Sequence, residues 1–187
     1  MFFVESLLLA LALCVDSLVV STTSAFKSKM SYHHGLLMAV IFALFQGGFP
    51  FLGALLGVAF KDLIALVDHW VAFGLLLLVG GKMIIDALRD VPDDRQLDIS
   101  KVGVLCLLGV ATSIDAFVVG IGLGLDNELP QIVFIVAVIA VVTFLVSMFG
   151  VVLGKRNIPI PERIASIVAG LVLIGLGAYT LIEHLTA

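Results

Sequence analysis

Residues 102–125, VGVLCLLGVATSIDAFVVGIGLGL, carry one charged side chain, Asp115, in an otherwise apolar run. About 20 mostly apolar residues in a helix cross the hydrocarbon core of a bilayer, so this stretch predicts a transmembrane helix with an acid near its middle. The run lacks the alternation of polar and apolar residues that is typical of barrel strands. It therefore favours an all-α integral membrane protein.

The composition of the whole chain is that of a protein that lies in a lipid bilayer. Of the 187 residues, 61% are hydrophobic and 13% are charged, whereas soluble domains carry roughly 45–50% apolar and about 25% charged residues. The mean hydropathy is +1.25. A soluble fold could not bury so much apolar surface. The net charge of −4 comes without a basic face, so no nucleic-acid partner is expected.

Five further stretches resemble residues 102–125, so we expect six transmembrane helices. Their expected limits are 2–26, 34–60, 66–89, 102–125, 131–154 and 163–186. A polar segment, 90–101, holds Pro92 and four aspartates and is expected to be a loop between a first three-helix half, 1–89, and a second, 102–187. The first stretch is expected to be a retained span, because a signal peptide needs a basic region before its apolar run.

The two halves of the chain resemble each other. Asp16 aligns with Asp115 at an offset of 99 residues, and the other two spans align at an offset of 97. The pairs at offset 97 are Gln46 with Thr143, Pro50 with Ser147, Gly53 with Gly150, Gly57 with Gly154, Gly80 with Gly177, and Asp86 with Glu183. Each half has an odd number of spans, so the second half enters the membrane from the opposite side. The sequence therefore predicts two inverted three-helix repeats.

Two glycine motifs of the repeat predict close helix contacts. Gly53-x-x-x-Gly57 and Gly150-x-x-x-Gly154 occupy equivalent positions in the second and fifth spans. Small residues at this spacing let helix backbones approach closely in lipid. We interpret both motifs as packing features.

The basic residues predict the orientation. Eight of them fall in the loops after spans one, three and five, namely Lys27, Lys29, Arg89, Arg95, Lys101, Lys155, Arg156 and Arg163. Lys61 alone falls on the other side, and Lys82 lies inside the third span. Cytoplasmic loops are enriched in Lys and Arg, so the three loops are expected to be cytoplasmic and both termini outside.

Asp16 and Asp115 are the main functional signal. Each lies about 14 residues into its helix, and opposite directions of the halves predict that the two acids converge at the middle of the bilayer. An aspartate there costs about 2.5–3.5 kcal/mol on insertion scales. No Arg lies at that depth, so we expect protonation or a bound cation to compensate. The structural alternative is a pair of neutral carboxyls that bridge helices.

The candidate ligands favour a hard divalent cation. Carboxylate, amide, hydroxyl and backbone oxygens suit Mn²⁺, Mg²⁺ or Ca²⁺, whereas zinc and copper prefer His or Cys. The four histidines, His33, His34, His69 and His184, are all expected near helix ends. Gln46, Thr112 and Thr143 are candidate auxiliary ligands, with the alternative that each bonds helix to helix. Pro50 frees a backbone carbonyl in the second span, which is a further candidate.

Asp86 and Glu183 are candidate gate or access carboxylates. They are repeat mates near the ends of the third and sixth spans, on opposite faces of the membrane. Lys82 lies one turn before Asp86, so a surface ion pair between these two side chains is the alternative.

Several motifs resemble a known family. VDS at 15–17 and ATSIDAFVVG at 111–120 are similar to the two aspartate motifs of the bacterial manganese efflux pump family, MntP-like proteins of the wider LysE-type exporter group. HWVAF at 69–73 and GGKMII at 80–85 also resemble it, and the likeness covers essentially the whole chain. The first aspartate motif departs from the Met-Asp-Ala-Phe form of the family. Gln46 stands where some members carry Glu, which lowers the negative charge of the site.

The resemblance implies export of Mn²⁺ from the cytoplasm, with Asp16 and Asp115 as the intramembrane acids. We therefore expect a transporter and not an enzyme, with Mn²⁺ as substrate, protons as counter-ion and no cofactor. Its place would be the inner (plasma) membrane of a bacterial cell, and its mechanism alternating access. Two alternatives stay open: a membrane thiol-redox conduit that uses Cys14 and Cys106, and an exporter of amino acids or other small solutes.

Overall fold

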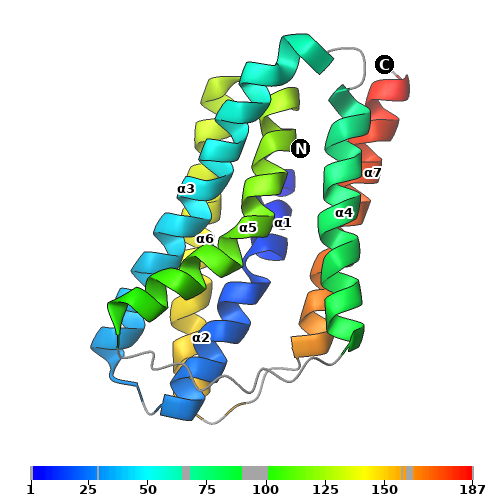
Figure 1. Ribbon diagram of the computed structural model, residues 1–187. Coiled ribbons are helices and arrows are strands. Elements are labelled where there is room, and N and C mark those ends of the chain that lie inside the picture. The colour runs from blue at the N-terminus through cyan, green and yellow to red at the C-terminus, as the bar shows by residue number, and fades with distance from the viewer. Residues whose placement is uncertain are drawn as a thin grey trace.

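The computed structural model describes residues 2–28, 30–64, 68–89, 101–156, 158 and 162–186. Within these ranges every regular element is an α-helix (Figure 1). The helices are α1 (Phe2–Leu13), α2 (Val15–Ser28), α3 (Tyr32–Ile64), α4 (Asp68–Arg89), α5 (Val102–Asp126), α6 (Leu129–Lys155) and α7 (Glu162–Thr186). The prediction of an all-α protein is confirmed for this part of the chain.

Four helical stretches are long and apolar enough to cross a membrane. They are Phe3–Phe26, Tyr32–Phe60, Val102–Asp126 and Leu129–Lys155. These confirm the expected first, second, fourth and fifth spans, and the chain is a multi-pass membrane protein. The helices α4 and α7 occupy the places of the third and sixth spans, with shorter apolar stretches at Phe73–Lys82 and Ser166–Tyr179.

The outside of the bundle is apolar and part of its inside is polar. Leu44, Leu78 and Leu145 are among the large apolar side chains exposed on its surface, whereas Gln46 and Thr143 are buried. Apolar side chains on the surface of a membrane protein contact lipid tails, which are equally apolar. Polar side chains in its helices face the interior of the bundle. The distribution is therefore that of a helix bundle surrounded by lipid.

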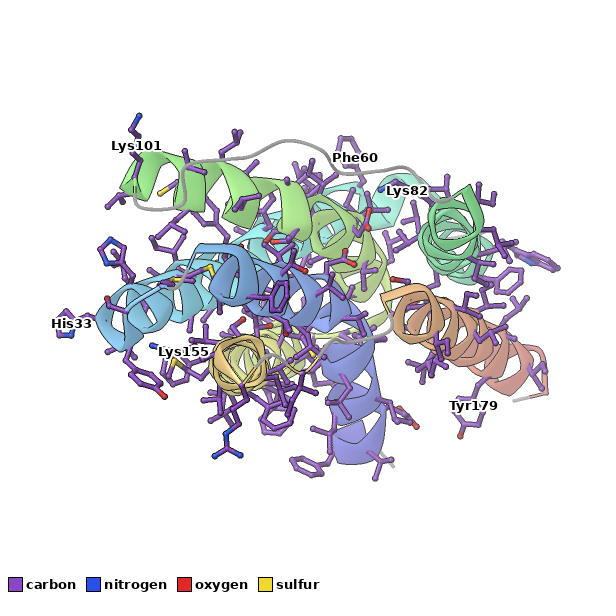
Figure 2. The ribbon with its side chains drawn as sticks, turned by 90° about the horizontal axis from the view of Figure 1, so that it is seen from below. His33, Phe60, Lys82, Lys101, Lys155 and Tyr179 are labelled. Carbon is purple, nitrogen blue, oxygen red and sulfur yellow. The ribbon has the colours of Figure 1, made fainter. Side chains whose placement is uncertain are left out.

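The first span is divided at Cys14. Helix α1 ends at Leu13, α2 begins at Val15, and Figure 2 shows the two at a wide angle to each other. Two backbone hydrogen bonds of 3.0 Å continue past the break, from Cys14 N to the Ala10 carbonyl and from Leu18 N to the Cys14 carbonyl. The sequence predicts one uninterrupted helix over 2–26. The break is the main difference, and it places Asp16 in the first turn of α2.

Each helix has defined neighbours. Helix α3 packs mainly against α5, and α6 packs against α2, α3 and α1. Helices α4 and α7 form a pair that stands beside this group in Figure 1. This pair reaches the rest of the bundle mainly through the contacts of α4 with α5 and of α7 with α1.

The helix ends gather at two opposite ends of the bundle. The last residues of α2, α4 and α6 and the first residues of α3, α5 and α7 lie at the lower end of Figure 1. The turn between α5 and α6 and the C-terminus lie at the upper end. At the lower end the ammonium group of Lys155 donates a 2.8 Å hydrogen bond to the Met30 carbonyl and lies 3.5 Å from the centre of the Tyr32 ring. These contacts hold the end of α6 to the start of α3.

Glycines set the distance between α3 and α5. A Cβ atom added at Gly53 would overlap the carbonyl oxygen of Phe117, and one added at Gly57 would overlap that of Ile121. The two backbones are therefore in direct contact. The close approach that the Gly53-x-x-x-Gly57 motif predicts is confirmed.

The second glycine motif does the same between α6 and α2. A Cβ atom at Gly150 would lie 2.9 Å from the Leu18 carbonyl oxygen, and one at Gly154 would overlap the carbonyl oxygen of Thr22. Leu18 and Thr22 stand 99 residues before Phe117 and Ile121. Each glycine motif thus contacts the corresponding carbonyls of the opposite half of the chain.

We predict that Gly57→Ala lowers the stability of the folded protein by about 1–3 kcal/mol, because the added methyl group forces α3 away from α5. Gly48→Ala on the same helix is the matched control, since nothing lies within 4 Å of a Cβ atom there. That control gains helix propensity and should be neutral or stabilising by up to about 1 kcal/mol. Thermal unfolding of the two purified variants tests the difference, and an equal loss in both would contradict it.

Candidate metal-binding site

The Gln46 side chain connects the two acid-bearing segments. It is 1% exposed, its amide nitrogen donates a 2.9 Å hydrogen bond to the Leu13 carbonyl, and its amide oxygen accepts one of 2.9 Å from the Ser113 hydroxyl. Leu13 lies three residues before Asp16, and Ser113 lies two residues before Asp115. One side chain of α3 therefore holds the segments of both acids at the same depth in the bundle.

The break in the first span explains the contact with Leu13. Leu13 ends α1, and carbonyl groups at a helix end need a partner that is not in their own helix. Inside a membrane no bulk water is available to provide one. The Gln46 amide fills that need, which assigns it the helix-to-helix role that the sequence leaves as an alternative. Whether its oxygen also binds a cation stays a prediction.

Asp16 lies where a helix favours a negative charge. It is the second residue of α2, in the first turn, and it is partly buried. Backbone dipoles leave a partial positive charge at a helix N-terminus, which stabilises a nearby carboxylate. The break at Cys14 thus provides part of the compensation that the sequence assigns to a proton or a cation.

Asp115 has a lysine beside it. The Lys82 ammonium of α4 lies 3.0 Å from one Asp115 carboxylate oxygen, and it both donates a hydrogen bond and forms an ion pair there. The Asp115 side chain is 17% exposed and that of Lys82 is 53% exposed. The expectation that no cation of the protein neutralises the central acids is wrong for Asp115. A long flexible lysine side chain can reach an acid on a neighbouring helix, which sequence distance does not reveal.

The two threonines of the predicted ligand set differ in their bonding. The Thr112 hydroxyl is buried and donates a 3.1 Å hydrogen bond to the Gly109 carbonyl of its own helix. The Thr143 hydroxyl is fully buried and has no hydrogen-bond partner among the described residues. Thr143 is therefore the more available oxygen of the two.

Three serines share the situation of Thr143. Ser17, Ser21 and Ser147 are fully buried, and within the part of the chain that the structure describes their hydroxyls lack a hydrogen-bond partner. Ser17 and Ser21 belong to α2 and Ser147 to α6, two helices that pack together. Sequence reasoning missed these hydroxyls, because a serine on an apolar helix usually bonds to its own backbone.

For the candidate gate residues the structure describes the helices but not the side chains. Asp86 and Glu183 belong to α4 and α7, but their side chains lie outside the described part of the structure. Their roles, and the ion pair suggested between Asp86 and Lys82, stay predictions.

Cys14 and Cys106 are free thiols. Cys14 is buried and donates a 3.2 Å hydrogen bond to the Leu11 carbonyl. Among the described side chains no three His, Cys, Asp or Glu gather around one point. A cation site built on Asp16 and Asp115 with hydroxyl, amide and backbone oxygens therefore stays a prediction.

Fold and site together define a multi-pass helical membrane protein with charged groups inside the bundle, which is the architecture of an ion transporter. A family model described as "Putative manganese efflux pump" matches residues 29–181. The chain belongs to this family, MntP. The family is one of transporters and not of enzymes, and Mn²⁺ is its substrate and not a cofactor.

Individual relatives agree with the family model. A protein of Parabacteroides distasonis named "Putative manganese efflux pump MntP" is 40% identical over 187 residues, 99% of this chain and 98% of the relative. A Wolinella succinogenes protein named "Putative manganese efflux pump MntP 1" is 40% identical over 97% of this chain and 98% of its own. A Methanosarcina barkeri protein with the first of these names is 40% identical over 99% and 98%. No solved structure matches the chain.

We predict that Gln46→Leu destabilises the protein by about 2 kcal/mol and Ser113→Ala by about 1 kcal/mol, because an unsatisfied buried polar group costs about 1–3 kcal/mol. The first change removes both hydrogen bonds of the bridge, and the second removes one. Thermal unfolding of the purified variants gives the order. A Ser113→Ala variant at least as unstable as Gln46→Leu would contradict the bridge.

Proposed function

We propose that this protein exports Mn²⁺ by alternating access through a site that includes Asp16 and Asp115. The observation that carries the proposal is the Gln46 bridge, because it ties both acid-bearing segments to one point of α3. Inverted-repeat transporters hold their substrates between the two repeats near the middle of the bilayer. In this proposal the two negative charges of Asp16 and Asp115 balance those of one divalent cation.

Two observations support manganese as the cation. The relatives of similar length are named manganese efflux pumps. The proposed oxygen donors, which are Gln46, Thr112 and Thr143, suit a hard divalent cation better than zinc or copper. We propose all three as auxiliary ligands, with Thr143 first because its hydroxyl has no partner among the described residues.

The inverted repeat is part of the proposal. Under it α1 and α2 correspond to α5, α3 to α6, and α4 to α7. If the two halves are equivalent, the contact of α3 with α5 has a counterpart in the contact of α6 with α2. Both contacts are present. The glycine motifs of α3 and α6 follow the same rule. In the α4–α7 pair a Cβ atom at Gly80 would overlap the Gly170 carbonyl oxygen, and one at Gly177 would lie 3.1 Å from the Leu76 side chain and 3.3 Å from that of Phe73. Gly80 and Phe73 stand 97 residues before Gly177 and Gly170.

The proposed orientation places the lower end of Figure 1 in the cytoplasm. Lys101, Lys155 and Arg156 flank helix ends there, and Lys and Arg mark cytoplasmic loops. Both termini then lie outside the cytoplasm. The membrane in question is the inner (plasma) membrane of a bacterial cell. Asp86 would lie near the cytoplasmic end of α4 and Glu183 near the outer end of α7, as gates on the two sides.

The alternatives have weaker support. A thiol-redox conduit would need reactive thiols, whereas Cys14 is buried and bonded to a carbonyl of its own helix. An exporter of amino acids would need a fixed cation for the substrate carboxylate, and Lys82 is bound to Asp115. Neither explains why one amide connects the segments that carry the two acids.

We predict that Asp16→Asn and Asp115→Asn each give a folded protein that fails to protect cells from manganese, because either change removes half the negative charge of the site. Growth at high external manganese, together with total cellular manganese, measures the effect. We expect accumulation at the level of cells without the protein. Glu128→Gln at the start of α6 is the control acid and should protect as the unaltered protein does. Full protection by both Asn variants would remove the acids from the mechanism.

We also propose that protons move in the opposite direction, since a proton on Asp16 would lower the free-energy cost of a bare charge when the cation has left. Purified protein in vesicles that contain a pH-sensitive dye should show proton movement on addition of Mn²⁺. Vesicles with Asp16→Asn should show none. Metal movement without proton movement would refute the coupling but leave the site intact.

A further inference from the structure

The ion pair between Lys82 and Asp115 joins two parts of the molecule. Lys82 belongs to α4, which pairs with α7 beside the main bundle, and Asp115 belongs to α5 within it. Figure 2 shows Lys82 extending from α4 toward α5. The nitrogen–oxygen distance of 3.0 Å is that of a direct contact. The charge of Lys82 therefore occupies one oxygen of an acid that we propose as a cation ligand.

A lysine and a divalent cation compete for the Asp115 carboxylate. The Lys82 ammonium donates to one of its two oxygens, and a metal ion needs carboxylate lone pairs as its ligands. Two positive groups within contact distance also repel each other, most strongly where water is scarce. Binding of a metal ion at Asp115 consequently disfavours the ammonium group in its present position. The half-exposed Lys82 side chain has four methylenes with which to move away while its backbone stays in α4.

We propose that Lys82 is a built-in competitor of the transported cation, which takes over Asp115 when the cation leaves and yields it when the cation binds. The proposal rests on the role of Asp115 as a ligand. It makes Lys82 a positioning residue with two effects. The lysine weakens binding of the metal ion enough for release, and it ties the α4–α7 pair to α5 only in the metal-free state.

The second effect connects binding to movement. A ligand shifts a conformational equilibrium only by its difference in affinity for the two states. A metal ion that displaces Lys82 removes one contact between the α4–α7 pair and α5, so occupancy of the site favours arrangements in which the pair has moved. Alternating access needs a link of this kind between the ion and the helices.

Titration of purified protein with Mn²⁺ alone tests the competition. We expect Lys82→Met to bind Mn²⁺ about tenfold more tightly, the size that loss of one competing unit charge near a protein surface supports. Lys82→Gln keeps a hydrogen-bond donor without the charge and should show the same direction. In vesicles both variants should have a lower half-saturating Mn²⁺ concentration together with a lower maximal rate.

Three controls separate the outcomes. Lys82→Arg keeps the charge and should bind Mn²⁺ as the unaltered protein does, and so should Lys155→Met, which removes a lysine at the lower end of α6. A merely structural Lys82 would give unchanged or weaker binding in both the Met and Gln variants, which would overturn the proposal. Asp115→Asn is titrated alongside. If it binds Mn²⁺ normally, the site itself is refuted, whereas lost binding there without tighter binding in the Lys82 variants refutes only the competition.

Discussion

Two carboxylates inside an apolar helix bundle are the constraint on which the rest of this structure depends. Each must be compensated by groups that the protein itself brings to the same depth, because lipid offers none. The two acids receive different compensation. Asp16 lies in the first turn of α2, at the positive end of the helix dipole, and Asp115 contacts the ammonium of Lys82. Aligned positions of the two halves thus have different electrostatic surroundings.

The compensation of Asp16 depends on a broken helix, and Gln46 bonds the last residue before the break. A break in a span leaves backbone groups that need partners, and the amide of Gln46 serves the Leu13 carbonyl on one side and the Ser113 hydroxyl on the other. A glutamate at this position would lack the N–H that Leu13 accepts. The amide at this position therefore has a structural reason in this chain.

Packing decides where such a bundle can move. The helices α3 and α5 meet backbone to backbone at Gly53 and Gly57. The contact of α2 with α6 has fully buried hydroxyls of Ser17, Ser21 and Ser147 nearby, without partners among the described residues. The α4–α7 pair holds to α5 in part through the ion pair of Lys82 with Asp115. The contact with a charged and displaceable group is the one suited to respond to a cation.

The amino-acid sequence by itself determined that this protein lies in a membrane, that it is all-helical, where its four clear spans lie and to which family it belongs. Long apolar runs and local motifs give these results because they do not depend on distant contacts. It also marked Asp16 and Asp115, since an acid in an apolar run is expensive wherever the run folds. Only the tertiary structure decided what meets those acids. The break at Cys14, the Gln46 bridge and the reach of Lys82 to Asp115 depend on which helices lie side by side, and the lysine is 33 residues from its partner along the chain.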